Sequence, residues 1–123
     1  MVTGIGIDII ETVRMAEKIS KKNGFAKHVF SASEIKYCES QKNKAEHYAG
    51  RFAAKEALLK ALGTGLSGNF TLNEIEVRHD EMGKPSFYFT GTTRQAIKKR
   101  RISKIHLSIS HQKSVACAVV VIE

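Results

Sequence analysis

Residues 2–10 (VTGIGIDII) alternate with the period of two that is typical of a β-strand. The two faces of this strand carry, on one side, Ile5, Ile7 and Ile9 and, on the other, Gly4, Gly6 and Asp8. The isoleucines give the strand one apolar face. Because glycine has no side chain, another backbone or a ligand can approach the opposite face closely.

The rest of the first half is predicted to be helical, and the second half to consist mainly of strands. We expect helices, in chain order, over about 12–22, ended by Gly24; from a capping box of Ser31 and Glu34 to about Ser40; and over 45–62, ended by Gly63. We expect strands over 72–79; after the turn at 81–84, with Phe87 and Phe89 at strand spacing; over 105–110; and over 114–122. A basic helix over about 92–101 and a tight loop at 111–113 complete the pattern.

This order of elements indicates an α+β fold, with a largely antiparallel sheet and the long helix packed on it. The chain has 123 residues and contains no repeat or linker, so we expect a single domain, 1–123. No apolar run approaches the roughly 20 residues that a membrane helix needs, and the start lacks the pattern of a signal peptide. Cys38 and Cys117 are far apart and without metal-ligand spacing, which favours free thiols and a cytoplasmic protein.

The net charge of +8 suggests an anionic partner. The basic residues form two clusters: Arg14, Lys18, Lys21, Lys22 and Lys27, and Arg94, Lys98, Lys99, Arg100, Arg101 and Lys104. Each cluster fits a solvated helix face as well as a surface for nucleic acid, an anionic membrane, a phosphorylated molecule or an acidic protein. Charge alone therefore does not identify the partner.

Asp8 and Glu56 are the two carboxylates in unusual surroundings. Aspartate is depleted from strands, so Asp8 either serves a ligand or pairs with a nearby group. Glu56 shares a helix face with Phe52 and Lys60, where an ordinary surface pair with Lys60 is the simpler interpretation. Two carboxylates beside a lysine also suit Mg²⁺, which takes one or two carboxylates together with phosphate oxygens.

Three further motifs are ambiguous by themselves. The Gly-Thr-Gly at 63–65 either ends a helix or brings backbone amides to a phosphate. The GKP at 83–85 fits an ordinary hairpin turn, and the histidine that ends SISH at 108–111 fits a simple loop position.

In combination, these motifs resemble a known family. GIGIDIIETVR (4–14), RFAAKEALLKALGTG (51–65), GKP and SISH occur in an order and spacing similar to holo-[acyl-carrier-protein] synthase, the short bacterial type of 4′-phosphopantetheinyl transferase. The resemblance runs from residue 2 to residue 122, and its first two motifs are the most specific.

The resemblance implies an enzyme of fatty acid biosynthesis that moves the 4′-phosphopantetheine arm of coenzyme A to a serine of apo acyl carrier protein and releases 3′,5′-ADP. It implies that Asp8 and Glu56 bind Mg²⁺, and that Lys60 acts with them and contacts the phosphates. The residues implied to border coenzyme A, besides Lys60, are Gly63, Thr64, Gly65, Lys84, Pro85, Ser110 and His111. Those implied to receive the acidic carrier protein are Arg14, Lys18, Lys21 and Lys22.

The acceptor of the serine proton and the oligomeric state are two further points. The serine proton goes to Glu56 or to a water on the metal, and the sequence leaves both routes open. Short members of the family form trimers with active sites between subunits, which implies a homotrimer for this chain.

Two other functions compete with the transferase. A nucleic-acid-binding module would use both basic clusters, but it predicts stacking aromatic residues, and the chain has no Trp and only 7% aromatic residues. A Mg²⁺-dependent hydrolase would use the same carboxylates on water. A required protein acceptor separates the transferase from the hydrolase.

Overall fold

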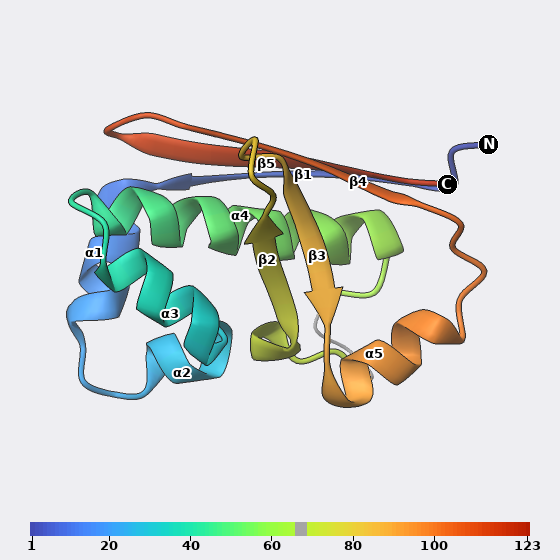
Figure 1. The fold of residues 1–123 in the computed structure, drawn as a ribbon, viewed down its shortest axis with the longest axis horizontal. Coiled ribbons are helices and arrows are strands. Elements are labelled where there is room, and N and C mark those ends of the chain that lie inside the picture. The colour runs from blue at the N-terminus through green and yellow to red at the C-terminus, as the bar shows by residue number, and fades with distance from the viewer. Residues whose placement is uncertain (66–68) are drawn as a thin grey trace.

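The computed structural model describes residues 1–65 and 69–123, and Figure 1 shows their fold. The strands are β1 (Gly4–Glu11), β2 (Ile75–His79), β3 (Pro85–Phe89), β4 (Ile105–His111) and β5 (Val115–Ile122). The helices are α1 (Thr12–Ser20), α2 (Phe25–Val29), α3 (Ala32–Glu39), α4 (Lys44–Leu62) and α5 (Gly91–Lys98), with a 3₁₀ turn η1 (Leu72–Glu74). None of the described helices is long and apolar enough to cross a membrane.

The strands form two antiparallel sheets. One has the order β1-β5-β4, with Asp8 opposite Ala118 and Ala118 opposite Ile109, and the other is the β2–β3 hairpin. α4 runs along one face of the three-stranded sheet, with α1, α2 and α3 at one end of the molecule and α5 at the other (Figure 1). The predicted α+β class with a long helix on an antiparallel sheet is confirmed, although the strands divide into two sheets.

The core lies between α4 and the inner face of the three-stranded sheet. It is built from Ala53, Ala54, Ala57, Leu58 and Leu59 of α4, from Ala118, Val120 and Ile122 of β5, and from Phe70, Ile75 and Val77. Because β5 alternates, its even-numbered residues are buried against α4. The small alanines allow the helix to approach the sheet closely.

The apolar face predicted for β1 exists, but it points away from the core. The side chains of Ile5, Ile7 and Ile9 are 68, 65 and 69% exposed, whereas Gly4 and Gly6 face α4. A Cβ at Gly6 would collide with the carbonyl oxygen of Ala57. The backbone of β1 therefore rests directly on the backbone of α4, which is the close approach that the glycines predicted.

Several predicted boundaries are corrected by the structure. The first helix ends at Ser20 rather than Lys22, and Gly24, with φ of 84°, begins α2 instead of ending α1. The five-residue α2 was not predicted. The capping box of Ser31 and Glu34 is confirmed. The predicted strand over 72–79 begins with η1, and the basic helix ends at Lys98 rather than 101.

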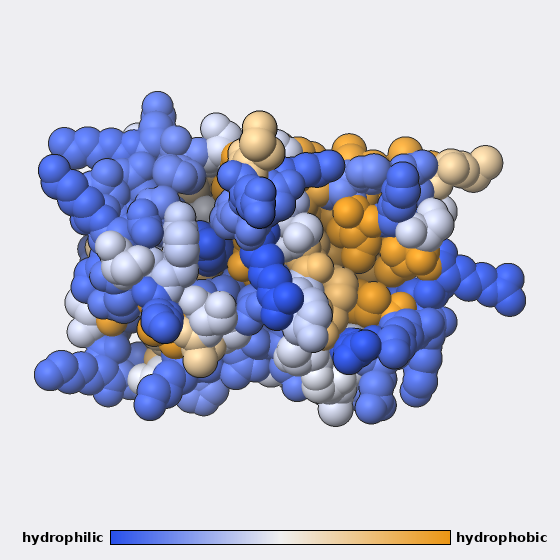
Figure 2. Space-filling model, in the orientation of Figure 1, coloured by the Kyte–Doolittle hydropathy of each residue, from blue (hydrophilic) through white to orange (hydrophobic). Residues whose placement is uncertain are grey.

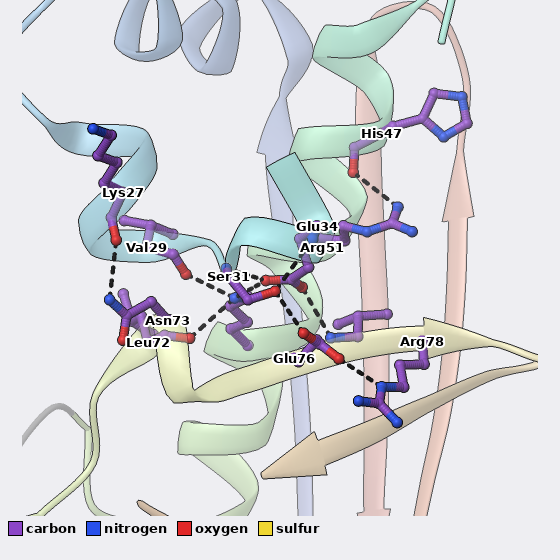
Figure 3. Close-up of polar contacts among 12 residues, drawn as sticks. Lys27, Val29, Ser31, Glu34, His47, Arg51, Leu72, Asn73, Glu76 and Arg78 are labelled. Carbon is purple, nitrogen blue, oxygen red and sulfur yellow. Dashed lines mark hydrogen bonds and ion pairs between the residues drawn. The ribbon is translucent and has the colours of Figure 1, made fainter. Parts of the chain in front are cut away.

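A buried ion pair connects the small helices α2 and α3 to α4. Lys55 is fully buried, and its Nζ donates to Glu34 Oε1 (2.6 Å) and to the carbonyl oxygens of Val29 (2.7 Å) and Leu72 (3.0 Å). Glu34 Oε2 accepts from the backbone N–H of Val77 at 2.9 Å. Figure 3 shows this network around Glu34, which links α2, α3, η1 and β2 to the long helix.

Candidate active site

Asp8 and Glu56 come together because β1 packs on α4 without intervening side chains. Gly4 and Gly6 lie against Ala61 and Ala57, and Asp8 is the next residue on that face of the strand. Both carboxylates line one cavity of about 420 Å³. The pattern of two glycines and an aspartate, opposite alanines one helical turn apart, thus creates the carboxylate pair.

Lys60 lies one helical turn after Glu56 and bonds to the strand. Its Nζ donates to Asp8 Oδ1 at 3.0 Å and to the carbonyl oxygen of Ile7 at 2.9 Å. The side chain of Asp8 is 17% exposed and that of Lys60 is 56% exposed. The lysine therefore stays open to solvent beside a sheltered aspartate, where it can also meet an anionic ligand.

Glu56 is in surroundings that disfavour its charged form. Burial is the main cause that raises the pKa of its carboxyl, the charge of Asp8 raises it further, and Lys60 opposes both. A bound cation would relieve this crowding of like charges. Among residues 1–65 and 69–123, no group of three or more His, Cys, Asp and Glu side chains is arranged to hold a metal ion. Two carboxylates are a number of protein ligands that fits Mg²⁺, whose other ligands would be phosphate oxygens and water.

The same cavity is bordered by two of the predicted docking residues. Arg14 and Lys18, one turn apart on α1, line it together with Glu11, Phe52 and Val115. Lys21 and Lys22 follow the end of α1 and are exposed. The positive surface thus begins at the rim of the carboxylate cavity and continues along the segment after α1.

The predicted Gly63, Thr64 and Gly65 lie at the C-terminal end of α4. Gly63 ends the helix in the left-handed conformation (φ of 76°), and its N–H donates to the carbonyl oxygens of Leu59 and Lys60. Gly65 has φ of 57°. A Cβ at either glycine would meet none of the described atoms within 4 Å.

His111 lies at the opposite end of α4, in a cluster that sequence reasoning missed. A cavity of about 180 Å³ is lined by Tyr37, His47, Gly50, Arg51, His79, Ile109 and His111. Arg51 is only 5% exposed, and its Nε has no hydrogen-bond partner among the described residues. Arg51 and His47 are one turn apart on α4, but without the positions of His79 and His111 the sequence shows only an ordinary helix face.

The remaining predicted pocket residues lie on this side of the molecule. Lys84 is exposed at the end of a turn whose Asp80 Oδ1 accepts from the backbone N–H groups of Met82 and Lys84, each at 2.8 Å. Pro85 begins β3 directly opposite His79. Ser110 precedes His111 on β4. Pro85 therefore lies beside the histidine cluster, whereas Ser110 is opposite Cys117 and on the outer face of the sheet.

The predicted site residues therefore fall into separate places within one chain. Asp8 and the carboxylate cavity lie at the β1 edge of the three-stranded sheet, and His111 lies on β4, the other edge strand. The Gly-Thr-Gly at 63–65 is at the far end of α4 from His111. A single copy of the chain does not bring all these residues around one ligand.

The second basic cluster borders a separate hollow of about 510 Å³. Lys98, Arg100 and Lys104 line it with the half-buried apolar side chains of Phe87, Phe89, Ile97, Ile102 and Ile105. Figure 2 shows a hydrophobic area between charged side chains over this part of the molecule. None of the residues predicted to form the active site lines this hollow.

Comparison with known proteins identifies the family of the chain. The model of the 4′-phosphopantetheinyl transferase superfamily matches residues 4–120. The chain is 48% identical over 123 residues to the holo-[acyl-carrier-protein] synthase of Clostridium tetani, covering 100% of this chain and 97% of that protein.

Two solved structures have the same fold. The holo-[acyl-carrier-protein] synthase of Neisseria meningitidis superposes with a TM-score of 0.91 at 32% identity, over 100% of this chain and 99% of the other. The synthase of Bacillus anthracis, in complex with CoA (3′,5′-ADP), gives 0.82 at 38% identity, over 99% and 96% of the two chains. The chain therefore belongs to the 4′-phosphopantetheinyl transferase superfamily, and within it to the holo-[acyl-carrier-protein] synthases.

Proposed function

We propose that this chain transfers the 4′-phosphopantetheine arm of coenzyme A to a serine of apo acyl carrier protein and releases 3′,5′-ADP in a Mg²⁺-dependent reaction. The observation that carries the proposal is the carboxylate pair of Asp8 and Glu56, beside Lys60 and at the rim of a positive surface. This arrangement suits a reaction in which a pyrophosphate is held by charge and a protein hydroxyl attacks it.

Each residue of the carboxylate site has a role in this reaction. Asp8 and Glu56 hold Mg²⁺, which neutralises charge on the pyrophosphate when it is bound. Lys60 contacts the same phosphates and stabilises the charge that develops on the leaving phosphate. Glu56 is also positioned to accept the proton of the attacking serine, directly or through a water.

The nucleotide part of coenzyme A is bound by residues from both ends of α4. Gly63, Thr64 and Gly65 shape one part of the pocket, and Lys84, Pro85, Ser110 and His111 border the other. Coenzyme A carries two anionic groups, the pyrophosphate and a phosphomonoester on the ribose. With the pyrophosphate at Asp8 and Glu56, the phosphomonoester fits the small cavity of Arg51 and His111, where a buried guanidinium has a donor without a partner among the described residues.

We assign the complete site to a homotrimer in which two neighbouring subunits share each pocket. The carboxylates lie at the β1 edge of the sheet and the histidine cluster at the β4 edge, so edge-to-edge association in a closed ring brings the two together. The outer face of this sheet supports the assignment. It carries the exposed Ile5, Ile7 and Ile9 and the half-exposed Val115, Cys117, Val119 and Val121. A face of this kind is typical of an interface between subunits.

Replacing Ile7 by aspartate is expected to break the trimer, because it places a charge in the middle of the apolar face of each subunit. Separation of the two halves of the site should lower kcat/KM by about 10²-fold. Sedimentation velocity measures the oligomer, and the transfer assay measures the activity. Met82→Asp, which also changes an exposed apolar residue, should leave the oligomer unchanged. A fully active monomer would contradict the shared site.

The carrier protein is proposed to dock on Arg14, Lys18, Lys21 and Lys22, which form a positive surface beside the carboxylate cavity. Reversing the charge of Lys21 (Lys21→Glu) should raise KM for the carrier about tenfold at low salt, since steering by opposite charge is lost. The difference from the wild type should shrink as salt is added. Lys98→Glu on α5, at the other end of the molecule, makes the same change of charge and serves as the control. Equal effects of the two variants would mean that the carrier protein docks on another surface.

The decisive test of the activity is the intact mass of an apo acyl carrier protein after incubation with this chain, coenzyme A and Mg²⁺. Gain of one phosphopantetheine arm, prevented by EDTA, supports the transferase. Consumption of coenzyme A without a gain of mass on the carrier supports the hydrolase instead.

Cys38 and Cys117 are free thiols, as predicted, which fits our assignment of the protein to the cytoplasm.

A further inference from the structure

Three imidazoles and one guanidinium surround the small cavity at the β4 edge. The rings of His47 and His111 are 5.3 Å apart, and the guanidinium of Arg51 lies 4.5 Å from the ring of Tyr37. The ring of His79 stacks on that of Tyr37 with a centroid distance of 6.3 Å. This many titratable rings around one cavity of about 180 Å³ is more than simple neutralisation of a phosphate requires.

Hydrogen bonds define the protonation of two of these rings. Arg51 Nη2 lies 3.3 Å from His79 Nδ1, and because a guanidinium only donates, this nitrogen of His79 accepts. The proton of the neutral His79 ring is therefore on Nε2. His111 Nδ1 lies 3.0 Å from Glu46 Oε1 and donates to that carboxylate. In the absence of an anion, His79 Nδ1 thus accepts a hydrogen bond from Arg51.

The surroundings disfavour a positive charge on His47 and His79. Burial is the largest cause that lowers the pKa of both imidazoles. The charges of His111 and Arg51 lower the pKa of His47 further, against Glu46, and those of Arg51, His47 and His111 lower the pKa of His79, against Asp80. Both rings are therefore mainly neutral at pH 7. A phosphate dianion in the cavity would favour their charged forms.

We propose that binding of the phosphomonoester of coenzyme A in this cavity is coupled to proton uptake by His47 and His79, so that the affinity for coenzyme A rises as the pH falls. This inference rests on the proposed function. The proton that His79 takes from solvent goes to Nδ1, which ends its bond to Arg51 and frees Nη2 to donate to the phosphate. His47 takes its proton from solvent in the same way.

The direction of the effect follows from linkage. When a ligand raises the pKa of a base, its affinity increases as the pH falls through the pKa of the bound state, and the limit is tenfold per pH unit for one proton. The phosphate takes up its own proton with a pKa of about 6, so that about half of it is protonated at pH 6, which works in the opposite direction. The effect should therefore be measured above that pH.

The experiment is isothermal titration calorimetry of the assembled protein with coenzyme A between about pH 8 and about pH 6.5, in buffers that differ in ionisation enthalpy. For the wild type we expect an affinity gain of about three- to tenfold toward pH 6.5 and a buffer-dependent enthalpy that reports proton uptake. Coenzyme A without the ribose phosphate (dephospho-coenzyme A) should show neither effect. His47→Gln with His79→Gln should reduce the affinity gain to less than twofold, whereas His28→Gln, on α2, should keep it.

The wild-type measurement alone can overturn the inference, even if the double variant fails to fold. Transfer activity together with a buffer-independent binding enthalpy would overturn the proton coupling and leave the proposed function intact. The same proton uptake with dephospho-coenzyme A would also overturn it, because the protons would then belong to another part of the site. Absence of coenzyme A binding at every pH would overturn both the inference and the proposed function.

Discussion

Replacing Asp8 by asparagine or Glu56 by glutamine is expected to lower kcat by about 10³-fold or more, because each change removes one of the two charges that hold the cation. Neither carboxylate belongs to the apolar core, so folding is expected to be largely kept. Asparagine and glutamine preserve the volume of the side chains, so the packing of β1 on α4 through Gly6 and Ala57 should not change. The mass-shift assay under single-turnover conditions measures the loss, and thermal unfolding checks the fold.

A matched control separates this effect from a simple change of charge. Glu123→Gln removes the negative charge of the Glu123 side chain, whose Oε1 lies 2.6 Å from His106 Nε2 on the surface. It should retain nearly all activity. If Asp8→Asn or Glu56→Gln also stays near wild-type activity, the assignment of these residues to the metal is wrong.

Replacing Lys55 by methionine is expected to lower the free energy of unfolding by about 3–5 kcal/mol, because it leaves the carboxylate of Glu34 buried without its counter-charge. The carbonyl oxygens of Val29 and Leu72 lose a donor at the same time. Urea unfolding followed by circular dichroism measures the loss. A second change, Glu34→Gln, should recover part of it, since it removes the uncompensated charge.

The exposed pair of Lys44 and Glu39 is the control for this experiment. Its atoms are 3.2 Å apart, but both side chains are about half exposed, so Lys44→Met should cost less than about 1 kcal/mol. A loss of similar size in both variants would mean that the network in Figure 3 does not hold the small helices in place.

Local patterns were sufficient to predict most of the elements that build the carboxylate site. The alternation of residues 4–8 placed Asp8 on the glycine face of β1, and helical spacing placed Glu56 and Lys60 on one face of α4; both features are confirmed. The short α2 was missed because five residues are too few to show a helical period. The turn η1 was predicted to be strand because Glu74 continues the polar face formed by Glu76 and Arg78.

Features that depend on distant parts of the chain could not be predicted. Lys55 and Glu56 are neighbours in a helix rich in Lys and Glu, yet one is fully buried and the other lines a cavity. What distinguishes them is the position of Glu34 below the helix, which no local pattern contains. In the same way, His47 and Arg51 are part of a cluster only because the β2–β3 hairpin places His79 beside them.

The contact between β1 and α4 has a consequence for the precision of the site. Where two elements are separated by large side chains, their distance depends on rotamers that can change with temperature or with a neighbouring mutation. Here the backbone of Gly4 and Gly6 rests on the backbone of Ala57 and Ala61, so no rotamer lies in the gap. The spacing of the two carboxylates is thus set by the thickness of the polypeptide chain itself, and the protein has no simple means of adjusting it.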